Sequence, residues 1–313
     1  MRAKSSATAP MTIAVSDRTG PAPTSVAAPG AQGTVLALLG VVSFSLTFPS
    51  TVWGLESFGP WSLVAVRSTL AAAIAGVFLL AGRVPLPERR HLAGLAVVAG
   101  GVVVGFPLLT TLALRTSTTS HAAVVVGLLP LTTAAFAAVR TGRRPSRTFW
   151  TAALAGAAVV IAFTVQQSGG ALSTGDLYLF GALLVCAAGY TEGGRLARVM
   201  PGWQVIGWAL VLSLPLMAPA SVVALSLEPV RLTAHGVIGL AWVAAGSTFF
   251  GLYVWYRGMA TIGIPRASQL QLAQPLLTLF WSVFLLGESL PLAAPVAAVG
   301  VLVCIAVTQR AKS

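Results

Sequence analysis

The chain alternates between long apolar stretches and short polar connections. We place ten apolar stretches at residues 34–52, 61–80, 92–114, 121–139, 149–166, 177–196, 203–225, 236–259, 267–286 and 291–308. A helix needs roughly 20 apolar residues to cross about 30 Å of hydrocarbon. The pattern therefore predicts an all-α integral membrane protein with ten transmembrane helices.

Basic residues lie almost entirely in every second connection. The two termini and connections two, four, six and eight, with the stretch ends beside them that carry Arg195 and Arg257, together hold 16 of the 19 Lys and Arg residues. The other connections hold only Arg115 and Arg231, and Arg67 falls inside the second stretch. Because cytoplasmic loops of membrane proteins are enriched in Lys and Arg, both termini are expected in the cytoplasm.

Composition supports a membrane protein and excludes several other classes. With 56% hydrophobic and 8% charged residues, a water-soluble globular domain does not fit. The net charge of +12 follows from the cytoplasmic loops, which face anionic lipids, so no nucleic-acid partner is expected. The two cysteines, Cys186 and Cys304, fall inside apolar stretches, and the histidines are scattered among loop edges, so neither a metal site nor a cofactor is predicted.

The N-terminal segment differs from the rest of the chain. Residues 1–33 are rich in Ala, Pro, Ser, Thr and Gly and lack an apolar core, which predicts a disordered cytoplasmic tail. Arg far outnumbers Lys and Asn is absent, a bias typical of GC-rich bacterial genomes. We therefore expect a multi-pass protein of a bacterial inner membrane.

The third and fourth stretches resemble the eighth and ninth at an offset of 145 residues. The matched pairs are Gly101 with Gly246, Thr116 with Thr261, Ala122 with Ala267, Pro130 with Pro275, Thr133 with Thr278, and Gly142 with Gly287. This predicts two five-helix halves, 34–166 and 177–308. An odd number of helices inverts the second half, which is an architecture of secondary transporters with a site near the midplane. The alternative is a chance likeness among helices rich in Ala, Leu and Val.

Three segments make the resemblance specific. The run YRGMATIGIPRASQLQLAQPLLTLFWSVFLLGESLP at 256–291, with GYTEGGRLAR at 189–198 and GWQVIGWALVLSLP at 202–215, is similar to the EamA-type drug/metabolite transporter superfamily. The resemblance implies ten helices and movement, usually outward, of small metabolites, amino-acid-like compounds or drugs. It departs at Arg143, because the family often carries a Glu after the glycine that follows helix 4.

Two ionisable side chains fall clearly inside predicted helices. Glu192, near the cytoplasmic end of the sixth helix, is a candidate for substrate recognition or proton coupling. A structural ion pair with Arg195 or Arg257 is the alternative. Arg67 is a candidate for holding a substrate carboxylate, and a structural role is its alternative.

Polar stripes give the remaining site candidates. One face of the ninth helix is polar and carries Ser268, Gln271, Thr278 and the mid-helix Pro275. Gln274 lies beside this face, and Leu279 lies on the opposite side, which we expect to face lipid. This face either lines a water-filled cavity or packs on a neighbouring helix. The other candidates are Ser43 and Thr47 in helix 1, Pro130 as a kink in helix 4, and Tyr190 as a cavity wall.

A secondary transporter is the leading interpretation. An integral-membrane enzyme would need several convergent catalytic groups, and a channel would need a filter-like ring, and neither pattern is present. ATP-driven pumping by this chain is excluded because no GxxxxGK[ST] run occurs. The sequence is compatible with proton-coupled antiport and with a passive channel or facilitator. It is also compatible with a homodimer packed through Ala293 and Ala297.

Overall fold

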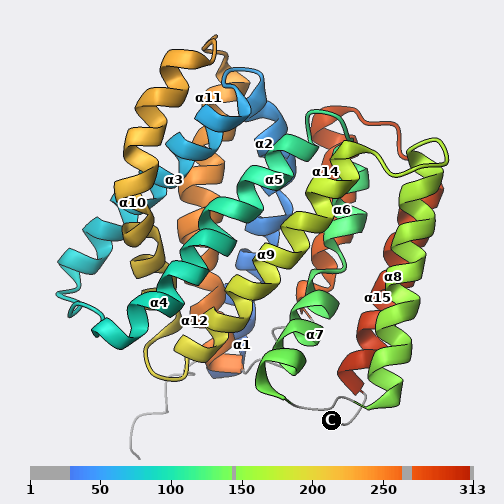
Figure 1. Cartoon of the computed structure of the whole chain (residues 1–313), viewed down its shortest axis with the longest axis horizontal. Coiled ribbons are helices and arrows are strands. Elements are labelled where there is room, and N and C mark those ends of the chain that lie inside the picture. Colours follow the sequence, from blue (N-terminus) through green and yellow to red (C-terminus); the bar gives the residue numbers. More distant parts are fainter. Residues whose placement is uncertain (1–28, 143–145, 263–269, 311–313) are drawn as a thin grey trace, which may run out of the picture.

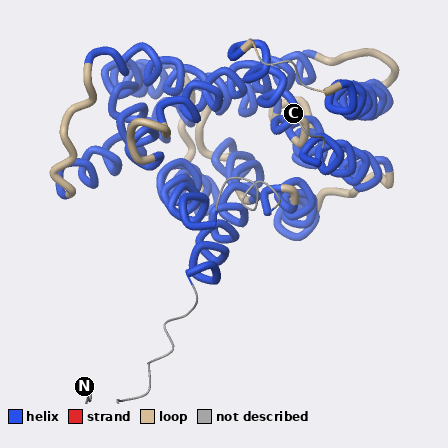
Figure 2. Tube along the Cα trace, turned by 90° about the horizontal axis from the view of Figure 1, so that it is seen from below, coloured by secondary structure: helices blue, strands red, loops and turns tan. Residues whose placement is uncertain are grey.

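The computed structural model describes residues 29–142, 146–262 and 270–310, and regular structure in these ranges is helical throughout (Figures 1 and 2). Eight helices of the described chain are long and apolar enough to cross a membrane. Two further apolar helices, Ala273–Leu286 and Ala293–Val307, are shorter. The chain is thus built from apolar helices, as the hydropathy pattern predicts.

The helical elements follow one another along the chain. They are α1 (Pro29–Ser45), α2 (Thr47–Leu55), α3 (Pro60–Ala81), α4 (Arg89–Val98), η1 (Ala99–Gly105), α5 (Phe106–Ala113), α6 (Thr119–Val126), α7 (Leu129–Thr141), α8 (Arg147–Gln167), α9 (Thr174–Leu196), α10 (Gly202–Leu227), α11 (Ala234–Ala241), η2 (Trp242–Gly251), α12 (Leu252–Ile262), α14 (Ala273–Leu286) and α15 (Ala293–Arg310).

The first helix begins earlier than the apolar pattern predicts. We expected residues 29–33 in the disordered tail, but α1 already begins at Pro29. Proline is well suited to the first helical position, because the N–H that it lacks would have no partner there. The tail before it, residues 1–28, lies outside the described residues, as do positions 267–269 of the predicted ninth helix.

Three spans are broken near the middle, and a proline follows each break. α1 gives way to α2 at Leu46, α6 to α7 after Val126, and α14 follows a turn at Leu272. Pro130 and Pro275, which we expected to kink their spans, lie in the first turn after an interruption, in α7 and α14. The first turn of a helix tolerates proline, since its N–H groups have no partner within the helix.

Backbone features recur at the sequence offset of 145. Gly101 lies in the π-helical segment η1, and its counterpart Gly246 lies in the π-helical segment η2. Gly142 and Gly287, which end α7 and α14, both adopt left-handed conformations, with φ of 67° and 65°. A left-handed residue is a common way to end a helix, and glycine adopts it without steric cost.

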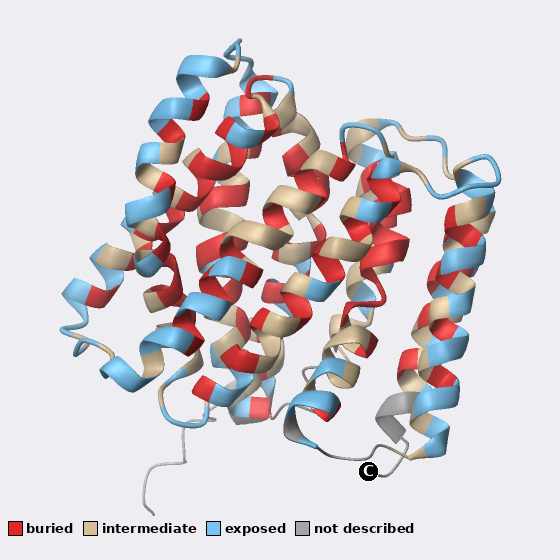
Figure 3. Ribbon diagram, viewed as in Figure 1, coloured by how far each residue is buried: buried red, intermediate tan, exposed pale blue. Residues whose placement is uncertain are grey.

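Helix pairs from distant parts of the sequence pack side by side. α3 packs on α10 at one edge of the bundle and α8 on α15 at the other, while α9 crosses between them (Figure 1). α1 packs along α12, where Gly258 approaches the backbone of Ala37. Buried residues follow the inward faces and exposed apolar residues the outward faces, as expected of helices that meet lipid (Figure 3).

The connections 56–59, 114–118, 168–173, 228–233 and 287–292 gather at one end of the bundle, the top in Figure 1. We call this the outer end, because the distribution of basic residues predicts that it faces away from the cytoplasm. The opposite end, which includes the connection 82–88, is the inner end.

Candidate functional site

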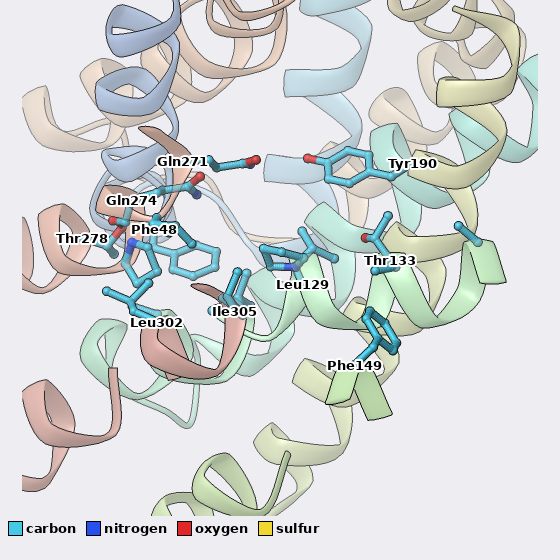
Figure 4. Close-up of a pocket in the computed structure, with 18 residues that line it drawn as sticks. Phe48, Leu129, Thr133, Phe149, Tyr190, Gln271, Gln274, Thr278, Leu302 and Ile305 are labelled. Atoms are coloured by element: carbon cyan, nitrogen blue, oxygen red, sulfur yellow. Dashed lines mark hydrogen bonds between the residues drawn. The ribbon is translucent and has the colours of Figure 1, made fainter. Parts of the chain in front are cut away.

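A cavity of about 460 Å³ lies between α6, α7, α9 and α14. α2, α8 and α15 complete its wall (Figure 4). The lining residues are Phe48, Ala123, Val126, Gly127, Leu129, Pro130, Thr133, Ala134, Ala137, Phe149, Tyr190, Gln271, Leu272, Gln274, Pro275, Thr278, Leu302 and Ile305.

Two of the helix breaks lie next to each other in the wall of this cavity. Gly127, at the break between α6 and α7, is so close to α14 that a Cβ atom added there would lie 3.6 Å from Cγ of Pro275. Pro130 and Pro275 both line the wall. The cavity is therefore centred where the fourth and ninth predicted spans are interrupted, and interrupted helices at membrane depth occur where they are buried or line a cavity.

Polar side chains enter the cavity from three helices. Figure 4 shows Gln271 and Tyr190 with their polar ends facing each other across the open space. Among the described residues, neither Gln271 nor Gln274 has a side-chain hydrogen bond, and the buried hydroxyl of Thr133 has no partner. Thr278 differs, since its hydroxyl donates to the carbonyl of Ser45 at 3.1 Å. The side chains of Gln271 and Gln274 are thus available to a ligand, whereas the hydroxyl of Thr133 is unpaired but shielded from the open space.

No charged side chain lines the cavity in the described part of the chain. Apart from the two glutamines, the hydroxyl groups and the phenol, the wall is aliphatic and aromatic. Such a wall suits a small, mostly apolar molecule that carries hydrogen-bonding groups.

Ser43, Thr47 and Arg67 do not line this cavity. Ser43 donates to the carbonyl of Gly246 at 2.7 Å, and Thr47 shares a hydrogen bond of 2.6 Å with Ser247. Arg67 donates to the hydroxyl of Thr248 at 2.7 Å. All three hold helices against η2, where the wider π-helical backbone leaves polar groups to satisfy. Ser268, the fourth member of the predicted polar face, lies outside the described residues.

Glu192 also lies outside the cavity wall. Its carboxylate accepts from Nε of Arg195 at 2.7 Å and lies 3.4 Å from Nε of Arg140 on α7. The pair with Arg195 is one of the two structural alternatives considered from the sequence. Arg257, the other, donates to the hydroxyl of Tyr253 instead. The contact with Arg140 joins two helices that the sequence did not connect.

Leu279 was expected on the lipid-facing side of the ninth helix, and this prediction is wrong. Its side chain is 4% exposed and belongs to a core cluster with Val124 and Val125. The outward face is instead formed by Phe280 and Phe284, which stack on each other and are 55% and 72% exposed.

Sequence reasoning missed a polar clasp one turn beyond the cavity toward the outer end. The carboxylate of Glu288 accepts from the backbone N–H groups of Thr119 and Ser120 at 2.7 and 3.0 Å. It also accepts from the hydroxyl of Ser120 at 2.7 Å, and this hydroxyl lies 2.8 Å from that of Ser282. The clasp joins the start of α6 to the end of α14, and a carboxylate is favourable at a helix N-terminus.

A second unforeseen contact lies at the same helix end. Nε2 of His121 is 2.6 Å from Oδ1 of Asp176, and both residues are buried. Asp176 also accepts from the hydroxyl groups of Ser168 and Ser173. Hydropathy placed His121 at the edge of a span, and its partner is 55 residues away, so the pair has no local signature.

Comparison with known proteins assigns the family. The model of the EamA-like transporter family matches the chain twice, over residues 31–165 and 173–309. The chain belongs to the EamA-like transporter family.

A curated relative agrees with this family assignment. The chain is 42% identical over 282 residues to the uncharacterized transporter YdeK of Bacillus subtilis (strain 168), covering 89% of this chain and 97% of that protein. A solved crystal structure of a protein is similar in fold, with a TM-score of 0.63 over 88% of this chain and 96% of the other, at 20% identity. The protein is therefore a multi-pass membrane transporter.

Proposed function

We propose that the protein is a secondary transporter that exports small organic compounds across a bacterial inner membrane. The observation that carries this proposal is the cavity between interrupted helices, because it combines apolar walls with hydrogen-bonding groups that have no partner. Small-molecule sites are usually of this kind.

The two matched segments support an arrangement of two inverted halves of five helices. Gly101 and Gly246, like Gly142 and Gly287, occupy equivalent backbone features at the offset of 145. Helices of both segments line the cavity. Inverted halves with a shared central site allow access to alternate between the two sides of a membrane.

The outline of the cavity favours access from the inner end. Its lining reaches Phe149, two residues after α8 begins, whereas the clasp at Ser120 and Glu288 lies one turn beyond the cavity at the outer end. We infer a state that is closed outward, in which an exporter would take up its cargo. A reporter that is active only outside the cytoplasm, fused after Ser313, should therefore stay silent, and activity would contradict the cytoplasmic C-terminus.

The cavity chemistry supports uncharged or amphipathic cargo ahead of amino acids. A zwitterion would leave both of its charges without a partner in the described wall, and unpaired charge is costly to desolvate. Drug-like and weakly polar metabolites fit better, with Gln271 and Gln274 supplying hydrogen bonds.

Metabolite profiling and a drug-sensitivity screen of a deletion strain would identify the cargo by the pool that expands or the resistance that falls. In proteoliposomes, Gln271→Leu and Gln274→Leu should each raise KM for that cargo roughly fivefold, since one hydrogen bond to a ligand is worth about 1 kcal/mol. Phe280→Leu on the lipid-facing side is the matched control and should change nothing. Unchanged KM in both glutamine variants would show that the cargo does not use this cavity.

A further inference from the structure

Arg67 places a permanent positive charge inside the bundle. It lies seven residues after Pro60, where α3 begins at the outer end, so its Cα is about 10 Å from that end along the helix axis. The residue is only 5% exposed. A guanidinium group stays charged inside proteins, so Arg67 does not lower the cost of burial by losing a proton. A charge at this depth therefore calls for a counter-charge.

No carboxylate of the described chain supplies this counter-charge. The structure describes every acidic residue of the sequence except Asp17, which belongs to the predicted cytoplasmic tail. The described ones are Glu56, Glu88, Asp176, Glu192, Glu228 and Glu288. Each has contacts of its own at a helix end or in a connection. None lies within 4.0 Å of a nitrogen of Arg67, so the charge of Arg67 has no ionic partner among them.

The neutral contacts of Arg67 leave part of its guanidinium without partners. Nη2 donates to the hydroxyl of Thr248 at 2.7 Å, and this hydroxyl donates to the carbonyl of Val243 at 2.6 Å. Nε is shielded and has no hydrogen-bond partner in the described part of the chain. Nη1 has no hydrogen bond there either, but it is not fully shielded. Buried donors without partners in a folded protein indicate a water molecule or an ion.

Aromatic rings do not compensate the charge either. The guanidinium that lies over a ring within the described ranges is that of Arg257, 5.6 Å from the centre of the Tyr253 ring. Arg67 thus has neither a carboxylate nor an aromatic face, and the charge around it is positive. This charge distinguishes an anion from a neutral water molecule as the missing partner.

Hydroxyl groups hold the helices around Arg67 in fixed positions. Ser68 donates to the carbonyl of Val103 at 3.3 Å, which ties α3 to η1. Ser247, next to Thr248, shares its hydrogen bond of 2.6 Å with Thr47 of α2. The guanidinium is therefore held in place before any ligand binds, which lowers the entropy cost of binding.

We propose that Arg67 binds a small monovalent anion, such as chloride, in the interior of the bundle. The anion would accept from the N–H groups of the guanidinium that Thr248 leaves without a partner. One cation among neutral groups matches one negative charge, and the low exposure of Arg67 suits an ion better than an organic molecule. Arg67 does not line the transport cavity, so this site does not depend on which cargo is exported.

The test measures thermal unfolding of the purified full chain in detergent while sodium chloride replaces sodium gluconate at constant ionic strength. An anion that binds only the folded protein raises the melting temperature, so the wild type should gain several degrees along a curve that saturates. Bromide should act like chloride. Arg67→Met, which keeps the length of the side chain but removes its charge, should lose this gain. Arg198→Met, at an exposed arginine near the inner end, is the control and should keep it.

A second measurement uses only the wild-type protein, in case Arg67→Met does not fold. The ³⁵Cl NMR line of dilute chloride should broaden when the protein is added, and it should narrow again with bromide but not with gluconate. Equal melting temperatures in chloride and gluconate, with no line broadening, would show that water alone solvates Arg67. A gain that never saturates would be a general salt effect, and the same gain in a folded Arg67→Met protein would place the anion elsewhere; either result overturns the proposal.

Discussion

The Glu288 clasp should control access to the cavity from the outer end. Its carboxylate receives three donors at 2.7 to 3.0 Å, two of them N–H groups in the first turn of α6. Glu288→Gln keeps one acceptor oxygen but loses the charge and turns an amide N–H₂ toward the backbone donors. From the values for charged hydrogen bonds and helix capping, we estimate a loss of about 2 kcal/mol. If the clasp forms only in the outward-closed state, this corresponds to a roughly 30-fold shift toward opening.

Accessibility can be measured with a single cysteine in the cavity wall. Gln271→Cys, in a background with Cys186→Ala and Cys304→Ala, would be treated in intact cells with a membrane-impermeant thiol reagent, because this side chain faces the open space (Figure 4). Its reaction should be slow with Glu288 present and faster by up to 30-fold in Glu288→Gln, because labelling from outside follows the population of the outward-open state.

The chain contains a matched control for this measurement. Glu228 holds the start of α3 through the N–H and the hydroxyl of Ser62, much as Glu288 holds α6, but neither α3 nor α10 lines the cavity. Glu228→Gln should therefore lower the melting temperature by a similar amount without changing the labelling of the cavity cysteine. If both variants lose stability and neither changes labelling, the Glu288 clasp is a structural cap and the gating argument is wrong.

Two further predictions concern buried or partly buried ion pairs. Glu192→Gln should cost about 1 kcal/mol of stability and leave concentrative transport intact, because the arginine partners of Glu192 are largely exposed. A stable variant without concentrative transport would make Glu192 the coupling residue. His121→Ala should lower the free energy of unfolding by about 2 kcal/mol, because it removes a buried partner of Asp176. His235→Ala, at an exposed pair, should lower it much less. Equal shifts of the melting temperature in the two variants would contradict this.

The spans and the polar face of the ninth helix could be predicted because their signals are local. Hydropathy over about 20 residues detects a helix, and a spacing of three and four residues places Gln271 and Thr278 on one face. The same spacing could not tell which neighbour a face meets. Ser43 and Thr47 form a comparable stripe, yet they bind η2, and Leu279 is buried against α6 instead of lipid.

Contacts between distant segments had no signal in the sequence. Glu288 and Ser120 are separated by 168 residues, and each lies in a segment that hydropathy assigns to a connection. Because charged groups inside a membrane are costly, the sequence pointed to Glu192 as a site candidate. Its partners, however, lie close to the inner end. Acidic residues at the ends of spans were overlooked because a carboxylate there needs no special explanation until its distant partner is known.

The broken helices explain why the cavity lies where it does. A break leaves backbone groups without helical partners, and in a membrane these must be satisfied by protein or by a cavity. At the break in the first span, α14 supplies the partners: Thr278 donates to the carbonyl of Ser45, and Trp281 donates to its hydroxyl at 3.0 Å. The breaks at Gly127 and Leu272 instead line the cavity. At the break after Val126 the N–H groups of Gly127 and Leu128 still donate to the carbonyls of Ala123 and Val125. The polar contacts that the wall offers to a ligand are therefore mainly the side chains of Gln271 and Gln274, which is why these two residues are the ones to substitute in a test of cargo recognition.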